Sequence, residues 1–388
     1  MAAFYDSLNV KRHGSELGKF RKLVLNDQEA VPTMDGDAHR TRKAYLLAAH
    51  TSEWIDGYLK ESAEFQEKLV VLIKEAAAGA GVEGKVALFP IILKTYIKML
   101  AKVWFGLEAG DEYVANFLAL SAGFQAPLPI DLPGTTYRAG IVARDALFAT
   151  YADQLAKHRK NPDAYKHTAL SALLAKQQEY ELSDLMMLTE LHHFVFASSG
   201  LMAPVLCAAL MGLGTNPEAL ARARAEADAH ADLLSSASTA DIGNQLPFLA
   251  WTIKEATRKY AFIPIQLGLA NREFEVDGYT IPSGTFLIAG LHATDMDPAI
   301  WTAPEKFDPA RYERGEGLGD FDHVPFGAGN KAQTHRCPGG PAAASMSTVI
   351  LGRLLLEFDF GLEAGQDQVP KGPLPANGLP VKITSRRA

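Results

Sequence analysis

The segment PFGAGNKAQTHRCPGG, residues 325–340, contains Cys337, one of the two cysteines in the chain. Glycines precede this cysteine, and small residues followed by apolar positions at helical spacing come after it, so we expect it to lie just before a helix. Backbone N–H groups at a helix N-terminus stabilise a thiolate, and glycines let a flat group come close. This context favours a thiolate ligand to a haem iron, with a redox thiol and a structural cysteine as the alternatives.

Two further motifs precede the cysteine loop. Glu255 and Arg258 are three residues apart on a predicted helix, where their side chains can pair. The sequence FDPARY at 307–312 then supplies Arg311. The order Glu-x-x-Arg, strands, Phe-x-Pro-x-Arg-Tyr, glycine-rich loop and Cys-Pro-Gly resembles the cytochrome P-450 superfamily, over residues 30–388.

The resemblance implies a haem b cofactor (iron protoporphyrin IX) whose iron is bound by Cys337. It also implies that the loop residues Phe326 and Gly339 lie against the haem. Glu255, Arg258 and Arg311 are implied to form a buried hydrogen-bonded network, which is structural rather than catalytic.

The length of the cysteine loop indicates a branch of that superfamily. The family's phenylalanine lies seven residues before the cysteine, where this chain has Asn330, and Phe326 lies eleven residues before it. The longer loop, with its His-Arg-Cys-Pro-Gly ending, resembles the bacterial fatty-acid peroxygenase and decarboxylase branch. The segments FYD, KRHG and MDGDAH near the N-terminus agree with this branch. By resemblance, His39 and Lys43 contact the haem propionates, and His335 is a third candidate for such a contact.

The central helix departs from the branch. The branch has an Arg-Pro pair that anchors a substrate carboxylate, and the corresponding positions here are Phe196 and Ala197, with no arginine or lysine anywhere in 183–220. The acid–alcohol pair of oxygen-activating monooxygenases is missing as well. His193 is a candidate distal acid–base, although a satisfied polar position at the start of a buried helix is the alternative. Ser198 or Ser199 is a candidate for holding a water molecule.

These residues need a mainly helical scaffold to hold them. Apolar residues recur at helical spacing through most of residues 37–213, with Thr51 or Ser52 as a helix cap. After Tyr260 the sequence alternates and carries Asp-Gly and Ser-Gly turn signals, which predict short strands. We therefore expect one domain over 1–388, mainly α with a small β portion (α+β), of the cytochrome P-450 fold. The family's N-terminal β segment would precede FYD, and the expected fold is one without that segment.

Composition excludes several classes of protein. The net charge of −7 and the lack of a basic block argue against nucleic-acid binding. No signal-peptide core occurs at the start, and no uninterrupted apolar run reaches the length of a membrane span. Cys207 lies in an apolar run and is expected to be a buried hydrophobe. Two cysteines 130 positions apart predict neither a disulfide framework nor a zinc site, and they fit a reducing cytoplasm.

The preferred functional interpretation is a haem-thiolate hydroxylase that oxidises an apolar, amphipathic or fatty-acid-like substrate with hydrogen peroxide. One alternative is a monooxygenase that depends on NAD(P)H and redox partner proteins, or an enzyme that rearranges a peroxide already in its substrate. The other is a haem-binding module without turnover. The sequence leaves open the substrate, the position oxidised and the oligomeric state.

Overall fold

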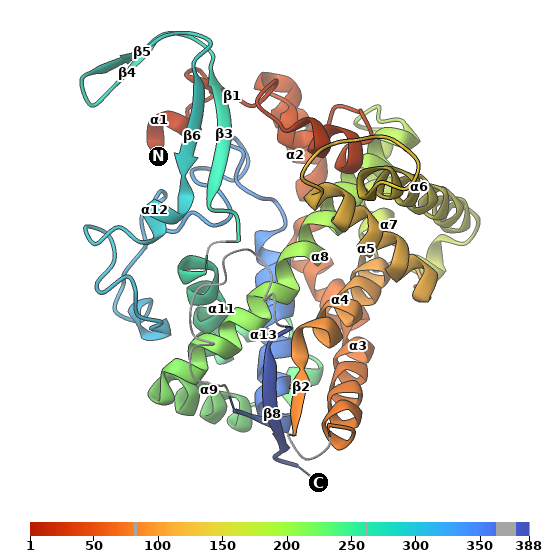
Figure 1. Ribbon diagram of the computed structural model, residues 1–388, viewed down its shortest axis with the longest axis vertical. Helices are drawn as coiled ribbons and strands as arrows, with labels where there is room; N and C mark the ends of the chain where they lie inside the picture. The colour runs from red at the N-terminus through yellow and green to blue at the C-terminus, as the bar shows by residue number, and fades with distance from the viewer. Residues whose placement is uncertain (81–83, 261, 362–377, 388) are drawn as a thin grey trace.

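The computed structural model describes residues 1–80, 84–260, 262–361 and 378–387. It is mainly helical with a small β portion, so the predicted fold class is confirmed (Figure 1). The helices are α1 (Ala2–Tyr5), α2 (Gly36–Leu47), α3 (Ser52–Ala78), α4 (Leu88–Phe105), α5 (Asp111–Gln125), α6 (Thr136–Lys160), α7 (Ala169–Gln177), α8 (Asp184–Thr215), α9 (Pro217–Ala229), α10 (Thr239–Gln245), α11 (Pro247–Lys259), α12 (Leu291–Asp295) and α13 (Gly340–Glu357). The strands are β1 (Val10–Lys11), β2 (Lys85–Ala87), β3 (Ile265–Ala270), β4 (Phe274–Val276), β5 (Tyr279–Ile281), β6 (Phe286–Gly290), β7 (Phe358–Gly361) and β8 (Pro380–Ser385).

Helix α8 runs through the middle of the molecule (Figure 1) and packs against α4, α11 and α13. The Ser183 side chain caps it by accepting a hydrogen bond from the N–H of Met186, and it ends at Asn216, whose side chain caps α9. Among the described residues, α8 is the one helix long and apolar enough to cross a membrane, but 72% of its most apolar stretch is buried within the fold. This burial is typical of a core helix.

A capping hydroxyl begins helix α3, and a glycine with positive φ ends helix α4. The Thr51 hydroxyl accepts a hydrogen bond from the N–H of Trp54 at 3.5 Å and caps α3, as the sequence predicts. Helix α4 ends at Gly106, which has φ 64° and stands so close to Tyr165 that a β-carbon would lie 2.6 Å from the ring. A residue with a side chain would therefore be both strained and crowded at this helix end.

The strands form small antiparallel sheets at opposite ends of the helical body (Figure 1). In one sheet β3 pairs with β1 and β6, so the N-terminal residues lie beside residues 265–290. In another, β8 pairs with β2 and β7. Asp277 and Gly278 both have positive φ in the turn between β4 and β5, as a tight hairpin requires. The first of these sheets brings the residues after β1 towards the cysteine loop.

His192 is a fully buried titratable residue of the core, on α8 where it packs against α6. Its Nε2 atom lies 3.2 Å from the carbonyl oxygen of Leu23, and its ring contacts Phe148 and Tyr151. Burial lowers the pKa of His192 to about 4. The folded protein therefore holds this imidazole neutral.

We predict that His192→Phe reduces the acid sensitivity of folding. As the pH falls below about 6.5, His192 binds a proton in the unfolded chain but stays neutral in the folded chain. The free energy of unfolding of the wild type should then fall relative to that of the variant by about 1.4 kcal/mol per pH unit, down to the folded pKa. Urea denaturation of both proteins between neutral and mildly acidic pH measures this difference, and parallel stability curves would contradict the prediction.

Candidate active site

Cys337 lies at the end of a loop that runs from residue 325 to the start of α13. Its backbone N–H donates a hydrogen bond to the carbonyl of Phe326 at 2.7 Å, which closes the loop. Gly327 has φ +79°, and a β-carbon there would stand 3.1 Å from the Cα of Arg336. The positive φ of Gly327 and the close approach of the Arg336 backbone both disfavour a side chain at this position. The loop thus presents the cysteine shortly before a helix, where the sequence predicts it.

Cys337 is exposed as a whole residue, but protein closely surrounds its thiol. Burial raises the pKa of its thiol, while the backbone N–H groups of Gly339 and Gly340 and the ammonium of Lys43 act in the opposite direction. The donors around the sulfur suit a thiolate, which is the form of cysteine that binds a metal.

Side chains with nitrogen donors gather beside this loop from three segments. The rings of His39 and His335 stack with centroids 4.0 Å apart, and Nε2 of His335 lies 2.9 Å from the carbonyl oxygen of Met34. Arg12, just after β1, joins them in lining a small cleft. The structure therefore brings together two of the three residues predicted to contact propionates.

Two buried atoms in this cleft, Nε2 of His39 and Nε of Arg12, have no hydrogen-bond partner among the described residues. Burial is the main cause that lowers the pKa of His39 to about 4 and that of Arg12 to about 10. A carboxylate bound here would accept hydrogen bonds from both side chains and favour their charged forms. The cleft therefore fits the propionate groups of a haem.

Lys43 clamps the cysteine loop to α2. Its Nζ atom donates hydrogen bonds to the carbonyl of Thr334 at 3.1 Å and to that of Arg336. Burial lowers the pKa of Lys43 to about 8, although Cys337 raises it. The residue thus fixes the backbone that carries the sulfur, and its contact with a propionate stays a prediction.

One face of α8 is only half-buried although the helix lies in the core. Its members are spaced at three and four residues and comprise His193, Phe196, Ala197, Gly200 and Leu201. The Phe196 ring packs against Phe124 of α5, with centroids 5.2 Å apart. The remaining surface of this face is partly accessible, which makes it a candidate surface for contact with a cofactor or a substrate.

His193 and Ser198 differ in whether their polar side-chain atoms have hydrogen-bond partners. The Nδ1 atom of His193 is buried without a hydrogen-bond partner in the described structure, and burial lowers the pKa of this residue to about 4. Ser198 is engaged, because its hydroxyl donates to the carbonyl of Phe194 at 2.6 Å and accepts from Nε1 of Trp104 at 3.1 Å. This geometry favours His193 over Ser198 as the polar group of the α8 face.

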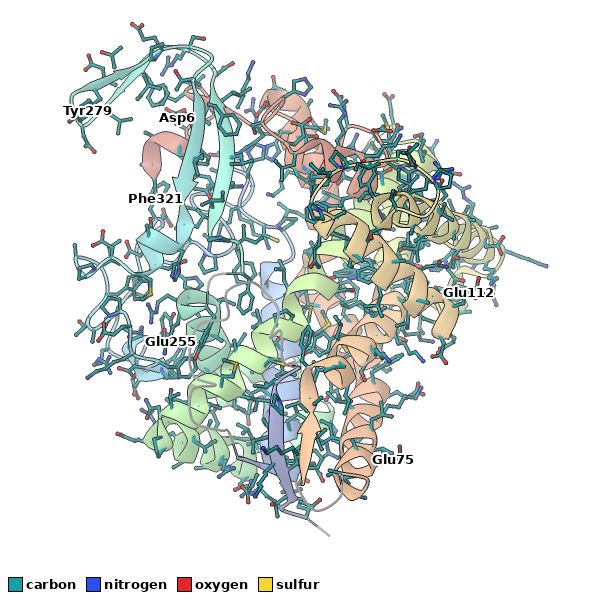
Figure 2. All side chains as sticks on the ribbon, in the orientation of Figure 1. Asp6, Glu75, Glu112, Glu255, Tyr279 and Phe321 are labelled. Atoms are coloured by element: carbon teal, nitrogen blue, oxygen red, sulfur yellow. The ribbon has the colours of Figure 1, made fainter. Side chains whose placement is uncertain are left out.

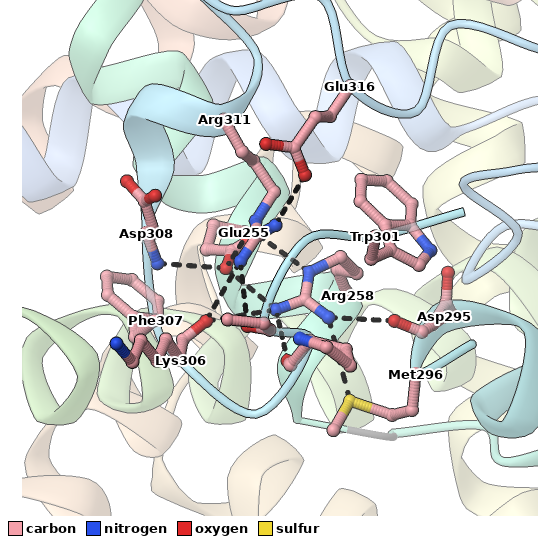
Figure 3. Close-up of polar contacts among 12 residues, drawn as sticks. Glu255, Arg258, Asp295, Met296, Trp301, Lys306, Phe307, Asp308, Arg311 and Glu316 are labelled. Carbon is pink, nitrogen blue, oxygen red and sulfur yellow. Dashed lines mark hydrogen bonds and ion pairs between the residues drawn. The ribbon is translucent and has the colours of Figure 1, made fainter. Parts of the chain in front are cut away.

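Glu255 is the centre of a buried network that supports the segment before the loop (Figure 3). Its carboxylate accepts two hydrogen bonds of 2.8 Å from Arg258 and one of 3.1 Å from Arg311. All three side chains have no exposed surface. In Figure 2 Glu255 lies inside the molecule, whereas Glu75 and Glu112 lie at its periphery. The interior carboxylate is thus held by two guanidinium groups that are themselves shielded from water.

The network continues to the cysteine loop. Arg258 donates a hydrogen bond to the carbonyl of Asp295 at 2.7 Å, and the Asp295 carboxyl accepts one from the N–H of Val324 at 3.2 Å. The guanidinium carbons of Arg258 and Arg311 also lie 5.2 and 5.8 Å from the centre of the Trp301 ring. Val324 immediately precedes the loop, so the network fixes the point from which the loop departs.

Sequence reasoning missed Arg12, Trp104 and His50 as residues of this site. The segment KRHG is visible in the sequence, but Nη1 of Arg12 reaches the carbonyl of Leu267, a partner 255 positions away. Trp104 likewise meets Ser198 across 94 positions. Such contacts depend on how helices and strands pack, and local spacing carries no signal for them.

The helical fold and a cysteine placed just before α13 suit a haem-thiolate oxidoreductase, and comparisons with known proteins identify the family. The model of the family "Cytochrome P450" matches residues 10–384. The chain therefore belongs to the cytochrome P450 family, a family of haem-binding monooxygenases and peroxygenases, and the predicted enzyme class is confirmed.

Relatives and solved structures are similar over most of the chain. "Probable cytochrome P450 524A1" of Dictyostelium discoideum is 26% identical over 387 residues, which cover 94% of this chain and 70% of that protein. "Abscisic acid 8'-hydroxylase 1" of Arabidopsis thaliana is 26% identical and covers 70% of this chain, which spans 56% of its length.

Two solved structures share the fold. Cytochrome P450EX alpha with myristic acid has a TM-score of 0.74 at 22% identity, covering 99% of this chain and 87% of that one. Retinoic acid-bound cyanobacterial CYP120A1 has a TM-score of 0.82 at 22% identity, covering 98% and 86%. At these identities the likeness establishes the fold.

We predict that Glu255→Ala destabilises the protein strongly, because it leaves two buried guanidinium groups without their carboxylate. The expected loss is on the order of 3–5 kcal/mol in the free energy of unfolding, measured by urea denaturation. The control is Glu313→Ala, which removes the exposed partner of Arg222 and should cost less than about 1 kcal/mol. Equal losses in the two variants would show that the buried network is not a main support of the fold.

Proposed function

We propose that this chain is a haem b peroxygenase that hydroxylates an apolar or amphipathic, fatty-acid-like molecule with hydrogen peroxide. Haem bound through Cys337 would supply the oxidising iron, and a thiolate ligand favours cleavage of the O–O bond. One peroxide oxygen is inserted into a C–H bond, and the other leaves as water. The observation that carries the proposal is the half-buried face of α8, which has one ionisable group and otherwise apolar or small residues.

The apolar residues of that face select the substrate. Phe196 and Ala197 stand at the positions where an anchoring Arg-Pro pair is expected, and Phe196 packs on Phe124 rather than on a charged group. A carboxylate brought against this face would be buried without a hydrogen-bond partner, which is costly. Uncharged, amphipathic molecules therefore fit against this face at least as well as free acids.

His193 is the group on this face that can move a proton. The residue as a whole is only half-buried, so its neutral imidazole can accept a proton from the peroxide and return it to the leaving oxygen. Burial holds the pKa of His193 at about 4, so the ring is neutral and available as a base at neutral pH. The neighbouring hydroxyl of Ser198 is held by Phe194 and Trp104 and is left out of this role.

We predict that His193→Phe lowers kcat/KM for hydrogen peroxide by about 10²–10⁴-fold, the usual contribution of a general acid–base. Haem content and the thiolate spectrum should persist, because the substitution leaves Cys337 in place. The control is His13→Phe, at an exposed position. Steady-state turnover of an uncharged alkyl substrate with peroxide alone is the measurement. Undiminished turnover in the His193 variant would exclude the assigned role.

We predict that fatty alcohols or amides shift the haem spectrum of the wild type as effectively as the free acids do. Phe196→Arg should then raise the affinity for the acid alone by about tenfold or more, because a charge-assisted hydrogen bond contributes about 1.5–3 kcal/mol. Phe196→Leu, which removes the ring without adding charge, should leave the selectivity unchanged. Spectral titration measures all three proteins. A strong preference of the wild type for free acids would disprove the apolar assignment of this face.

A reductase-dependent monooxygenase is the second candidate, favoured by the names of relatives such as "Abscisic acid 8'-hydroxylase 1" and "Geraniol 8-hydroxylase". It would take electrons from NAD(P)H through partner proteins. Turnover with peroxide alone supports the first proposal, and turnover only with NAD(P)H and redox partners supports the second. A haem-bound protein inert in both assays would be a binding module. The two free cysteines fit a reducing compartment such as the cytoplasm.

A further inference from the structure

His50 is a buried histidine beside the cysteine loop that the proposed reaction does not use. It ends the short 3-10 helix Ala48–His50 that follows α2, and 6% of its surface is exposed. Nδ1 lies 2.8 Å from the carbonyl oxygen of Leu46. Because a carbonyl only accepts hydrogen bonds, Nδ1 carries the proton and Nε2 carries a lone pair. Nε2 is buried and has no partner among the described residues.

The Nε2 atom of His50 and the sulfur of Cys337 both lie close to Gly339. A β-carbon built on Gly339 would stand 3.5 Å from Nε2 of His50 and 3.9 Å from Sγ of Cys337. The two donor atoms therefore flank one point at the start of α13. The charges of Lys43 and Lys331 act both on the pKa of His50 and on that of Cys337, which is consistent with this closeness.

Aromatic side chains also pack against the His50 ring. Its ring meets Phe194 edge-on, with centroids 5.2 Å apart, and lies 5.9 Å from Trp104. Aromatic packing fixes the imidazole plane, and the hydrogen bond to Leu46 fixes the tautomer. An imidazole whose second nitrogen donates to a backbone carbonyl is the usual arrangement of a metal-binding histidine.

We propose that His50 is a second iron ligand built into the Cys337 side of the haem site, which coordinates the iron when the sulfur does not. This inference rests on the proposed haem binding. In the exchange, the sulfur leaves with its bonding electron pair and takes up a proton, and the lone pair of Nε2 forms the new bond to iron. The oxidation state of the iron does not change. The protein would thus retain haem in a nitrogen-bound form after losing its thiolate bond.

The test compares Cys337→Ala with the double variant Cys337→Ala/His50→Phe, both produced with haem. Low-temperature electron paramagnetic resonance and magnetic circular dichroism report the axial ligand of the ferric protein, and haem retention is measured by transfer to a haem acceptor protein. We expect an imidazole signature in the single variant. In the double variant this signature should be lost, with haem transfer faster by about tenfold or more.

Two control variants distinguish ligation by His50 from ligation by another histidine and from loss of the fold. Cys337→Ala/His193→Phe removes the histidine of the α8 face and should keep the imidazole signature. His50→Phe alone should keep the thiolate spectrum, which shows that this substitution leaves the fold intact. The proposal is overturned if Cys337→Ala fails to hold haem, if its spectrum is the same with and without His50, or if the His193 double variant is the one that loses the signature. A wild type without a thiolate spectrum would instead contradict the proposed function.

Discussion

A desolvated sulfur surrounded by fixed donors is the constraint on which the site depends. Burial by itself keeps Cys337 protonated, and the N–H groups of Gly339 and Gly340 with the ammonium of Lys43 oppose that effect. The balance leaves a thiol that a metal ion can deprotonate, because the donors for the resulting thiolate are already in place. Lys43 contributes twice, since it also holds the carbonyls of Thr334 and Arg336.

The Glu255 carboxylate, which lies outside the cysteine loop, helps to fix the position of that loop. Glu255 neutralises parts of two buried guanidinium groups, and Arg258 passes the constraint through Asp295 to Val324. A buried charge network of this kind is costly to assemble and more costly to break. Its effect here is on position, since it determines where the cysteine loop leaves the body of the protein.

Helix α8 differs from the cysteine loop in the character of its side chains. The helix is mainly apolar, and its half-buried face carries a single ionisable side chain, His193. Arg12, His39 and His335 line a small cleft in which Nε2 of His39 and Nε of Arg12 are buried without a partner among the described residues. An anionic cofactor edge suits this cleft, and an uncharged substrate suits the α8 face.

Local patterns in the sequence predicted the elements that carry strong local signals. The Thr51 cap of α3, the Asp277-Gly278 turn, the long α8 and the position of Cys337 before α13 all follow from neighbouring residues. The partners of Glu255 were identified through family resemblance, and the structure brings them together. Arg12 and His50 were missed because their importance comes from segments distant in the chain. The roles of His39, Lys43, His335 and His193 stay predictions, although the geometry of each is compatible with its role.

The absorption spectrum of the reduced protein with carbon monoxide tests the central claim most directly. Thiolate ligation through Cys337 predicts the red-shifted Soret band typical of this family, present in the wild type and in Cys207→Ala and absent in Cys337→Ala. The same band in Cys337→Ala, or its absence from haem-loaded wild-type protein, would contradict thiolate ligation at this position.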